Sequence, residues 1–152
     1  ASYRELARRL AEERDVPVVV VGGRSEASLL AAVVEGVRGA HAMPGELNLR
    51  ASAALLAECR ALVGNDSGTV HLARAVATPV VVMFGSSAPA WSGPDPGEGE
   101  ALHLGLPCSP CFKRECPLTS ARYACLAGLT VDAALAALDR VTAVRPSAGL
   151  VR

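Results

Sequence analysis

Hydrophobic and polar positions along the chain follow two periods, one typical of amphipathic helices and one typical of buried strands. Apolar residues at helical spacing predict helices over residues 3–13, 25–37, 52–60, 69–76 and 130–141. Short apolar runs predict strands over residues 16–21, 40–43, 61–63, 80–84 and 101–105. Thr130 precedes the last helix and is suited to cap it. Strands that alternate with helices at this spacing predict βαβ units and a parallel sheet.

The composition agrees with this α/β pattern. Of the 152 residues 51% are hydrophobic but only 3% are aromatic, so the core must consist mainly of Val, Leu and Ala. Such a core is typical of helices packed on a parallel sheet, and the run 16–21 is expected to be buried on both faces. We expect one Rossmann-like α/β domain over residues 1–144, with a cysteine-rich segment at 107–126 and a tail at 145–152.

Charge and hydropathy narrow the classes of function. The 15 basic and 15 acidic residues cancel, which gives no electrostatic argument for binding nucleic acid. No apolar run approaches the roughly 20 residues that a membrane span requires. The first predicted helix is charged throughout and does not resemble a signal peptide. The sequence therefore predicts a soluble, cytoplasmic protein.

The turn between the predicted strand 61–63 and the predicted helix 69–76 is a candidate anion site. Gly64 and Gly68 permit close approach to the backbone, and the first N–H groups of a helix are free to bind phosphate. Ser67 and Thr69 add hydroxyl groups, and His71 lies one turn into the helix. Ligands of open parallel sheets bind at the carboxyl ends of strands, where this turn is expected.

A purely structural role is the alternative for the same turn. Asp66 or Ser67 is a common helix cap, so either side chain can simply terminate the helix. A single histidine such as His71 is often structural as well.

Residues 63–75 and 78–85 together resemble the signature of the bacterial lipopolysaccharide heptosyltransferases, glycosyltransferase family 9. That family typically shows G-N-D-S-G-P-M-H-L-A-A-A followed by T-P-V-V-x-L-F-G. In this chain Thr69 and Val70 replace Pro-Met, and Arg74 replaces an alanine. The likeness extends over about residues 3–141 and includes further short matches: Val20-Val21-Gly22-Gly23 with Glu26, Gly45 with Leu47, and Pro107 to Cys111.

The resemblance implies the C-terminal, donor-binding half of a GT-B glycosyltransferase that uses ADP-heptose, inverts the anomeric centre and needs no metal. It implies that Asp66 binds hydroxyls of the donor sugar and that Ser67, Gly68 and Thr69 bind the diphosphate. It gives His71 the role of stabilising charge on the departing diphosphate.

The resemblance places a second set of donor-binding residues earlier in the chain. Glu26 is expected to contact the ribose, and the backbone near Met43 is expected to face the adenine, with Gly22 and Gly23 in the same group. The structural alternatives are a solvated helix-start carboxylate for Glu26 and core packing for Met43.

The resemblance also implies an N-terminal acceptor domain that supplies the catalytic base, and we expect that domain to lie outside these 152 residues. We therefore expect the chain alone to bind nucleotide weakly and to transfer little sugar. The expected partners of the whole enzyme are a nucleotide sugar and the lipopolysaccharide core, at the inner membrane surface. A nucleotide- or phosphate-binding module without transferase activity, and a zinc-stabilised interaction domain, are the alternatives.

Four cysteines form a C-x2-C-x4-C-x8-C pattern, at Cys108, Cys111, Cys116 and Cys125. Four thiolates suit tetrahedral zinc or an iron–sulfur cluster, although the last spacing departs from paired C-x2-C motifs. Disulfides and free thiols stay open as well.

The only tryptophan, Trp91, lies in a Pro- and Gly-rich loop. It is expected to anchor the loop to the core, and bordering the donor pocket is the alternative.

Overall fold

The computed structural model describes residues 3–143, so the predicted tail at 145–152 lies outside the described residues. The chain divides into two compact units, residues 1–52 and 53–152, and each is described by itself. The sequence predicts one domain over residues 1–144, and that boundary stays a prediction.

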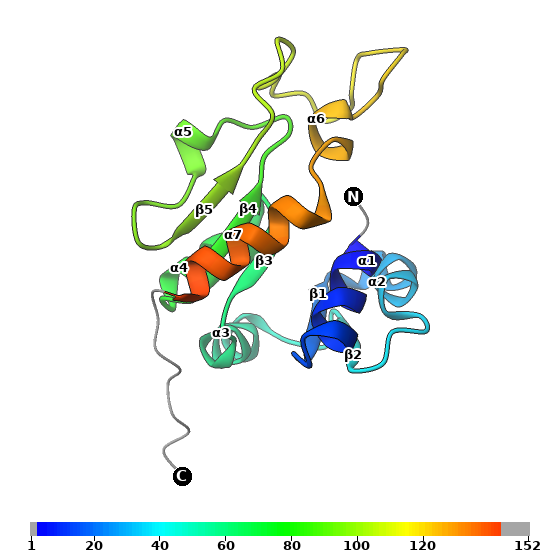
Figure 1. The fold of residues 1–152 in the computed structure, drawn as a ribbon, viewed down its shortest axis with the longest axis vertical. Helices are drawn as coiled ribbons and strands as arrows, with labels where there is room; N and C mark the ends of the chain where they lie inside the picture. Colours follow the sequence, from blue (N-terminus) through cyan, green and yellow to red (C-terminus); the bar gives the residue numbers. More distant parts are fainter. Residues whose placement is uncertain (1–2, 144–152) are drawn as a thin grey trace. The chain divides into compact units, whose positions relative to one another are not determined.

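The first unit is a two-stranded parallel sheet with helices packed on it (Figure 1). Its elements in chain order are α1 (Tyr3–Arg8), the π-helix η1 (Arg9–Glu13), β1 (Val18–Gly22), the 3-10 helix η2 (Arg24–Glu26), α2 (Ala27–Val34) and β2 (Ala40–Pro44). β1 and β2 pair from Val18 opposite Ala40 to Gly22 opposite Pro44. The buried side chains of this unit are those of Leu6, Ala7, Leu30 and Val37.

Two expectations for this unit need correction. The strand predicted at 16–21 begins at Val18, and Val19 is exposed, so the strand is not buried on both faces. A strand with a single neighbour in a two-stranded sheet has less cover than a central strand of a larger sheet. The helix predicted over 25–37 ends at Val34, because Gly36 takes a left-handed conformation with φ of 71°.

The second unit contains a three-stranded parallel sheet in the order β3-β4-β5. α3 (Leu49–Glu58) leads into it, and its further elements are β3 (Leu62–Asn65), α4 (Gly68–Ala75), β4 (Val80–Met83), α5 (Pro89–Ser92), β5 (Gly99–Leu102), α6 (Ala124–Ala127) and α7 (Val131–Ala143). The fold class predicted from the sequence, parallel sheets flanked by helices, is confirmed.

The core of the second unit lies on both faces of β4. Val80, Val82 and Phe84 are almost fully buried and pack with apolar residues of α3 and α4: Leu56, Val70 and Ala73. Val81, which alternation places on the opposite face, is also fully buried, and α7, which passes in front of β4 in Figure 1, contacts both β4 and β5. This packing fixes the strand ends on which the candidate site is built.

Local signals confirm some element ends and shift others. The backbone N–H of Ala133 donates to Oγ1 of Thr130 at 3.1 Å, which confirms Thr130 as the cap of α7. The strand predicted at 101–105 begins two residues earlier, at Gly99, where a Cβ would lie 2.1 Å from the carbonyl oxygen of Val80. Within residues 3–143, no helix is both long and apolar enough to cross a membrane.

Candidate functional site

The candidate site lies at the carboxyl ends of β3 and β4. Parallel pairing places Asn65, the last residue of β3, opposite Met83, the last residue of β4. The turn 66–67 and the turn 84–86 therefore leave the sheet at the same edge. This edge is where open parallel sheets bind their ligands.

The start of α4 is open and has no side-chain cap. Ser67 is the N-cap residue, with extended φ and ψ of −156° and 168°, but its hydroxyl makes no capping hydrogen bond. A Cβ added to Gly68 would have no atom within 4 Å. Gly64, in contrast, packs against the helix, since its Cβ would lie 3.4 Å from Val70. Ser67 and Gly68 are exposed and Thr69 is half-buried, so the start of α4 is accessible to solvent, as an anion site requires.

The Asp66 carboxylate makes its hydrogen bond with a residue outside α4. Its Oδ2 accepts a hydrogen bond from the hydroxyl of Ser92 at 2.9 Å, and its Oδ1 lies 3.6 Å from Nε2 of His71. The Asp66 side chain is 16% exposed and that of His71 is 49% exposed. The capping role considered as an alternative is thus performed by neither Asp66 nor Ser67. The structure places Asp66 and His71, two of the predicted site residues, close to each other.

Ser92 is a site residue that the sequence did not reveal. It ends α5, a single helical turn within the stretch 86–99, which is predicted as loop. Pro89 at the first helical position is the only local signal for this turn, because four residues are too few to show helical periodicity.

Trp91, on the same turn, is 80% exposed, so its predicted anchoring in the core is wrong. Its ring stacks on that of Phe112, with centroids 4.7 Å apart and planes at 24°. This stacking joins the turn to the cysteine-rich segment, and Trp91 is not part of the core at β4.

The cysteine-rich segment is fastened to the carboxyl end of β4. The N–H groups of Cys111 and Phe112 both donate to the carbonyl oxygen of Ser86, at 3.1 and 2.8 Å, and the hydroxyl of Ser109 donates to the carbonyl oxygen of Gly85. A Cβ at Gly85 would lie 2.7 Å from Cγ of Leu126, so only glycine allows this approach. The segment therefore borders the same edge of the sheet as Asp66.

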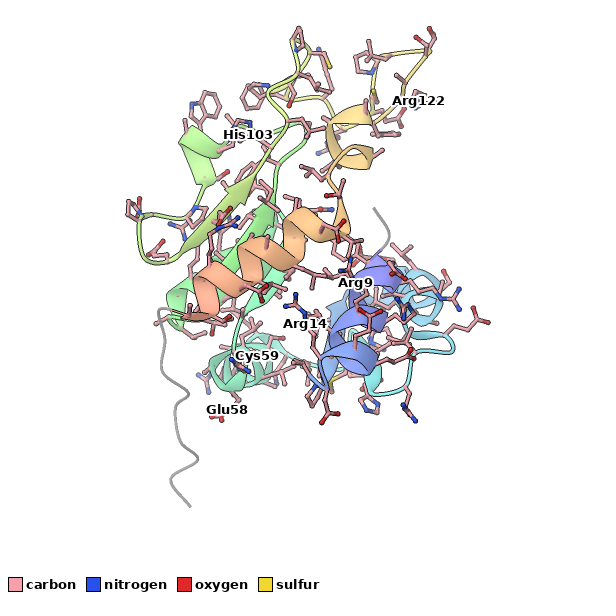
Figure 2. All side chains as sticks on the ribbon, viewed as in Figure 1. Arg9, Arg14, Glu58, Cys59, His103 and Arg122 are labelled. Carbon is pink, nitrogen blue, oxygen red and sulfur yellow. The ribbon has the colours of Figure 1, made fainter. Side chains whose placement is uncertain are left out.

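All five cysteines are free thiols. Within residues 3–143 no three His, Cys, Asp or Glu side chains are grouped as metal ligands, so the four cysteines of the spacing pattern do not meet in space. Hydrogen bonds from the backbone N–H groups of Tyr123 and Leu118, together with the charge of Arg122, lower the pKa of the Cys116 thiol. Burial raises the pKa of the Cys59 thiol, which directly follows the last residue of α3 (Figure 2).

The earlier set of predicted residues gathers at the carboxyl ends of β1 and β2. Val21 pairs with Met43, which is half-buried, and the N–H of Gly45 donates to the carbonyl oxygen of Gly22 at 2.7 Å. A Cβ at Gly22 would lie 2.9 Å from Cδ1 of Leu30, so glycine is needed there for helix packing.

Glu26 lies at the same edge, and its side chain accepts a hydrogen bond from the backbone. Its Oε2 accepts the N–H of Gly23 at 2.8 Å, a helix-start contact that matches the structural alternative for this residue. The residues implied by the resemblance thus form two groups, one at the strand edge of each unit.

Comparison with known proteins shows the family of this chain. The sequence profile of glycosyltransferase family 9 (heptosyltransferase) matches residues 1–122. Lipopolysaccharide heptosyltransferase 1 of Pseudomonas aeruginosa is 35% identical over 118 residues, which cover 76% of this chain and 32% of that protein. Lipopolysaccharide heptosyltransferase 2 of Escherichia coli K12 is 35% identical over 107 residues, which cover 67% of this chain and 30% of that protein. The chain thus spans about a third of the length of these relatives.

Solved structures share the fold. The E. coli ADP-heptose lipopolysaccharide heptosyltransferase II superposes with a TM-score of 0.76 at 24% identity, over 93% of this chain and 40% of that one. A family 9 glycosyltransferase from Veillonella parvula superposes with a TM-score of 0.75 at 20% identity, over 94% and 41%. Since the family profile matches well over half of its residues, this chain belongs to glycosyltransferase family 9, the heptosyltransferases.

Proposed function

We propose that this chain binds the nucleotide-sugar donor of a heptosyltransferase, with the diphosphate and sugar at the turn between β3 and α4. The observation that carries the proposal is the open, uncapped start of α4 beside the Asp66 carboxylate. A polar helix start of this kind, at the carboxyl edge of a parallel sheet, is suited to an anionic ligand.

The diphosphate is assigned to the helix start itself. The N–H groups of Gly68 and Thr69 and the positive end of the helix dipole attract negative charge, and the hydroxyls of Ser67 and Thr69 add donors. His71 lies one turn further, and its half-exposed ring is accessible to the same anion. In transfer, His71 would stabilise the charge that develops on the leaving diphosphate, which requires no metal.

The donor sugar is assigned to Asp66. A carboxylate accepts about four hydrogen bonds, and Ser92 supplies one. The remaining acceptor positions can receive sugar hydroxyls. A heptose agrees with the relatives, which are heptosyltransferases, and we propose ADP-heptose as the donor.

The nucleoside is assigned to the strand edge of the first unit. The second carboxylate oxygen of Glu26, not used by Gly23, would accept from the ribose. The backbone at Met43 would face the adenine, beside Gly22 and Gly23. This assignment uses the family resemblance together with the grouping of the four residues at one edge.

Sugar transfer itself is assigned to a longer protein. The relatives are about three times as long as the matched region, and we propose that an N-terminal acceptor domain supplies the catalytic base and binds the lipopolysaccharide core at the inner membrane surface. The 152-residue chain alone is then expected to bind donor but to transfer little sugar.

A titration of the isotope-labelled chain with ADP, UDP and GDP tests the donor site. ADP at millimolar concentration should shift the backbone amide signals of residues 67–71 more than UDP or GDP does. Gly68→Leu should fill the open space and abolish these shifts, whereas Gly68→Ala should weaken them. The absence of any ADP-dependent shift at residues 67–71 in the folded wild-type chain would refute the proposed site.

A further inference from the structure

We propose that Ser92 is a positioning residue that fixes the Asp66 carboxylate for the donor sugar, and that Arg74 holds Ser92 in place. The proposal rests on the donor site proposed above. It concerns three residues of the second unit that are joined by hydrogen bonds: Asp66, Ser92 and Arg74.

Asp66 depends on Ser92 for its orientation. It precedes the N-cap residue, so its carboxylate is not fixed by the N–H groups of α4. The separation of 3.6 Å from His71 Nε2 is longer than a hydrogen bond. The bond of 2.9 Å from the Ser92 hydroxyl is therefore the contact that sets the rotation of the carboxylate. With Oδ2 held in this way, Oδ1 stays directed toward the side of His71.

Ser92 in turn needs an external support. It lies at the end of a four-residue helix, which is too short to be stable alone. Nη1 of Arg74 donates to the carbonyl oxygen of Ser92 at 3.3 Å. The stacking of Trp91 on Phe112 fixes the other side of the turn.

Arg74 is held firmly enough to provide that support. Its Nε and Nη2 contact Oε2 of Glu98 at 2.8 and 2.7 Å, and Nη2 lies 3.7 Å from Oδ2 of Asp95. The N–H of Asp95 also donates to Glu98, at 3.1 Å. The Arg74 side chain is 19% exposed, whereas those of Glu98 and Asp95 are 41% and 80% exposed, so the contact with Glu98 is the better shielded of the two.

Arg74 also links the support to the site, because it lies on α4 with His71. The family pattern has an alanine at this position, so the arginine gives this chain a contact that the pattern does not provide. α4 thus carries both a residue of the donor site and the anchor of the residue that orients Asp66.

The decisive measurement separates the affinity that the donor sugar contributes from the affinity that the nucleotide contributes. Dissociation constants of the 152-residue chain for ADP and for ADP-heptose give the gain in affinity that the sugar adds. Ser92→Ala should reduce this gain about tenfold, as expected for the loss of one hydrogen bond to a charged group, and leave ADP binding unchanged. Ser92→Thr keeps a hydroxyl and should retain most of the gain. An equal loss for ADP and ADP-heptose would indicate a merely structural role and overturn the proposal.

A double-mutant cycle tests whether Ser92 acts through Asp66. In an Asp66→Ala background, Ser92→Ala should have no further effect on the sugar-dependent gain. A full additional loss in that background would show that Ser92 acts by another route.

Arg74→Met tests the anchor and should reduce the gain about threefold, less than Ser92→Ala, because the stacked Trp91 still holds the turn. The control is Arg140→Gln, which removes a comparable arginine–glutamate pair, with Glu100, from the second unit. It should leave the gain unchanged. An Arg74→Met protein that behaves like the control would remove Arg74 from the proposal.

A measurement without ligand keeps this inference distinct from the proposed function. The ring signals of His71 in the free chain should move on Ser92→Ala, because Asp66 is released beside the ring, and should stay in place on Ser92→Thr and Arg140→Gln. If ADP fails to bind but these ring signals move as expected, the donor site is wrong and the positioning contact is right. If donor binds with an Asp66-dependent gain but Ser92→Ala changes neither the gain nor the ring, only the positioning is wrong.

Discussion

In each unit a glycine lies at or next to the end of a parallel strand and a carboxylate follows beside a helix, yet the two carboxylates behave differently. At the edge of β1, Glu26 accepts the backbone N–H of Gly23. At the edge of β3, Asp66 leaves the N–H groups of α4 uncovered and bonds to the side chain of Ser92. One carboxylate thus bonds to its own backbone, and the other leaves its helix start without a side-chain cap.

The difference arises from where the acid stands relative to the helix start. Glu26 is three residues after Gly23, the spacing at which a carboxylate reaches back to the N–H before the first turn. Asp66 comes one residue before the N-cap residue Ser67, so it precedes the N–H groups that a cap would satisfy. The order strand, glycine, acid and helix therefore does not distinguish a structural cap from a candidate binding site, whereas the spacing does.

The largest effect on the comparison of the two strand edges is expected from removing a core side chain that supports β4. Phe84 is 1% exposed in the core that supports β4, and Phe84→Ala should destabilise the fold by about 3–5 kcal/mol. Hydrogen exchange should accelerate first in β3, β4 and β5. The matched variant in the first unit is Leu30→Ala, which should act first on β1 and β2. Identical exchange patterns for the two variants would show that the two edges are not held by separate cores.

A smaller effect is expected from adding one methyl group at each edge. Gly45 has φ of 61°, and its Cβ would lie 2.3 Å from Cγ of Arg24, so Gly45→Ala should cost at least about 1–2 kcal/mol in urea denaturation. Gly68→Ala meets no atom within 4 Å and should leave stability nearly unchanged while weakening ADP binding. A large loss of stability for Gly68→Ala would contradict the open space at α4.

The two carboxylates themselves give the next test. Glu26→Ala removes a helix-start hydrogen bond and should lower the free energy of unfolding by about 1 kcal/mol. Asp66→Ala should cost less stability but remove the sugar-dependent gain in affinity. Calorimetric unfolding and donor titration of both variants would show whether the roles are divided in this way, and a reversed result would break the comparison.

The smallest effect concerns acid. Hydrogen bonds from Arg8 in the first unit and from Arg140 in the second lower the pKa of Glu5 and Glu100 from the ordinary value of 4.5. A carboxylate with a depressed folded pKa stabilises the protein above the unfolded value and loses that contribution as pH falls through the folded value. Arg8→Gln and Arg140→Gln should therefore each flatten the loss of stability below about pH 4.5. Denaturation curves between neutral pH and pH 3 measure this slope, and unaltered slopes would exclude both pairs as its source.

Features that depend on residues near each other in the chain could be predicted from the sequence. The apolar run at β4, the glycine turn before α4 and the hydroxyl of Thr130 each determine structure through near neighbours, and they were predicted correctly. Asp66 and His71 are five residues apart in the chain and lie close to each other, but their roles at the site stay predictions.

Contacts between segments that are far apart in the chain could not be predicted from the sequence. Ser92 reaches Asp66 across 26 residues, and nothing in the composition of its loop distinguishes it from neighbouring serines. The cysteine-rich segment is attached to Ser86 by backbone N–H groups, which leave no mark on residue type. Trp91 was assigned to the core because large aromatic residues are usually buried, but its partner Phe112 lies outside the core.

The stacked pair of Trp91 and Phe112 has an optical consequence. Trp91 is the only tryptophan in the chain, so the indole emission of the whole protein originates at the joint between α5 and the cysteine-rich segment. Ser92 is the next residue, and movement of this turn would alter the solvent around the ring. The protein therefore carries its own fluorescent reporter next to the residue that holds Asp66.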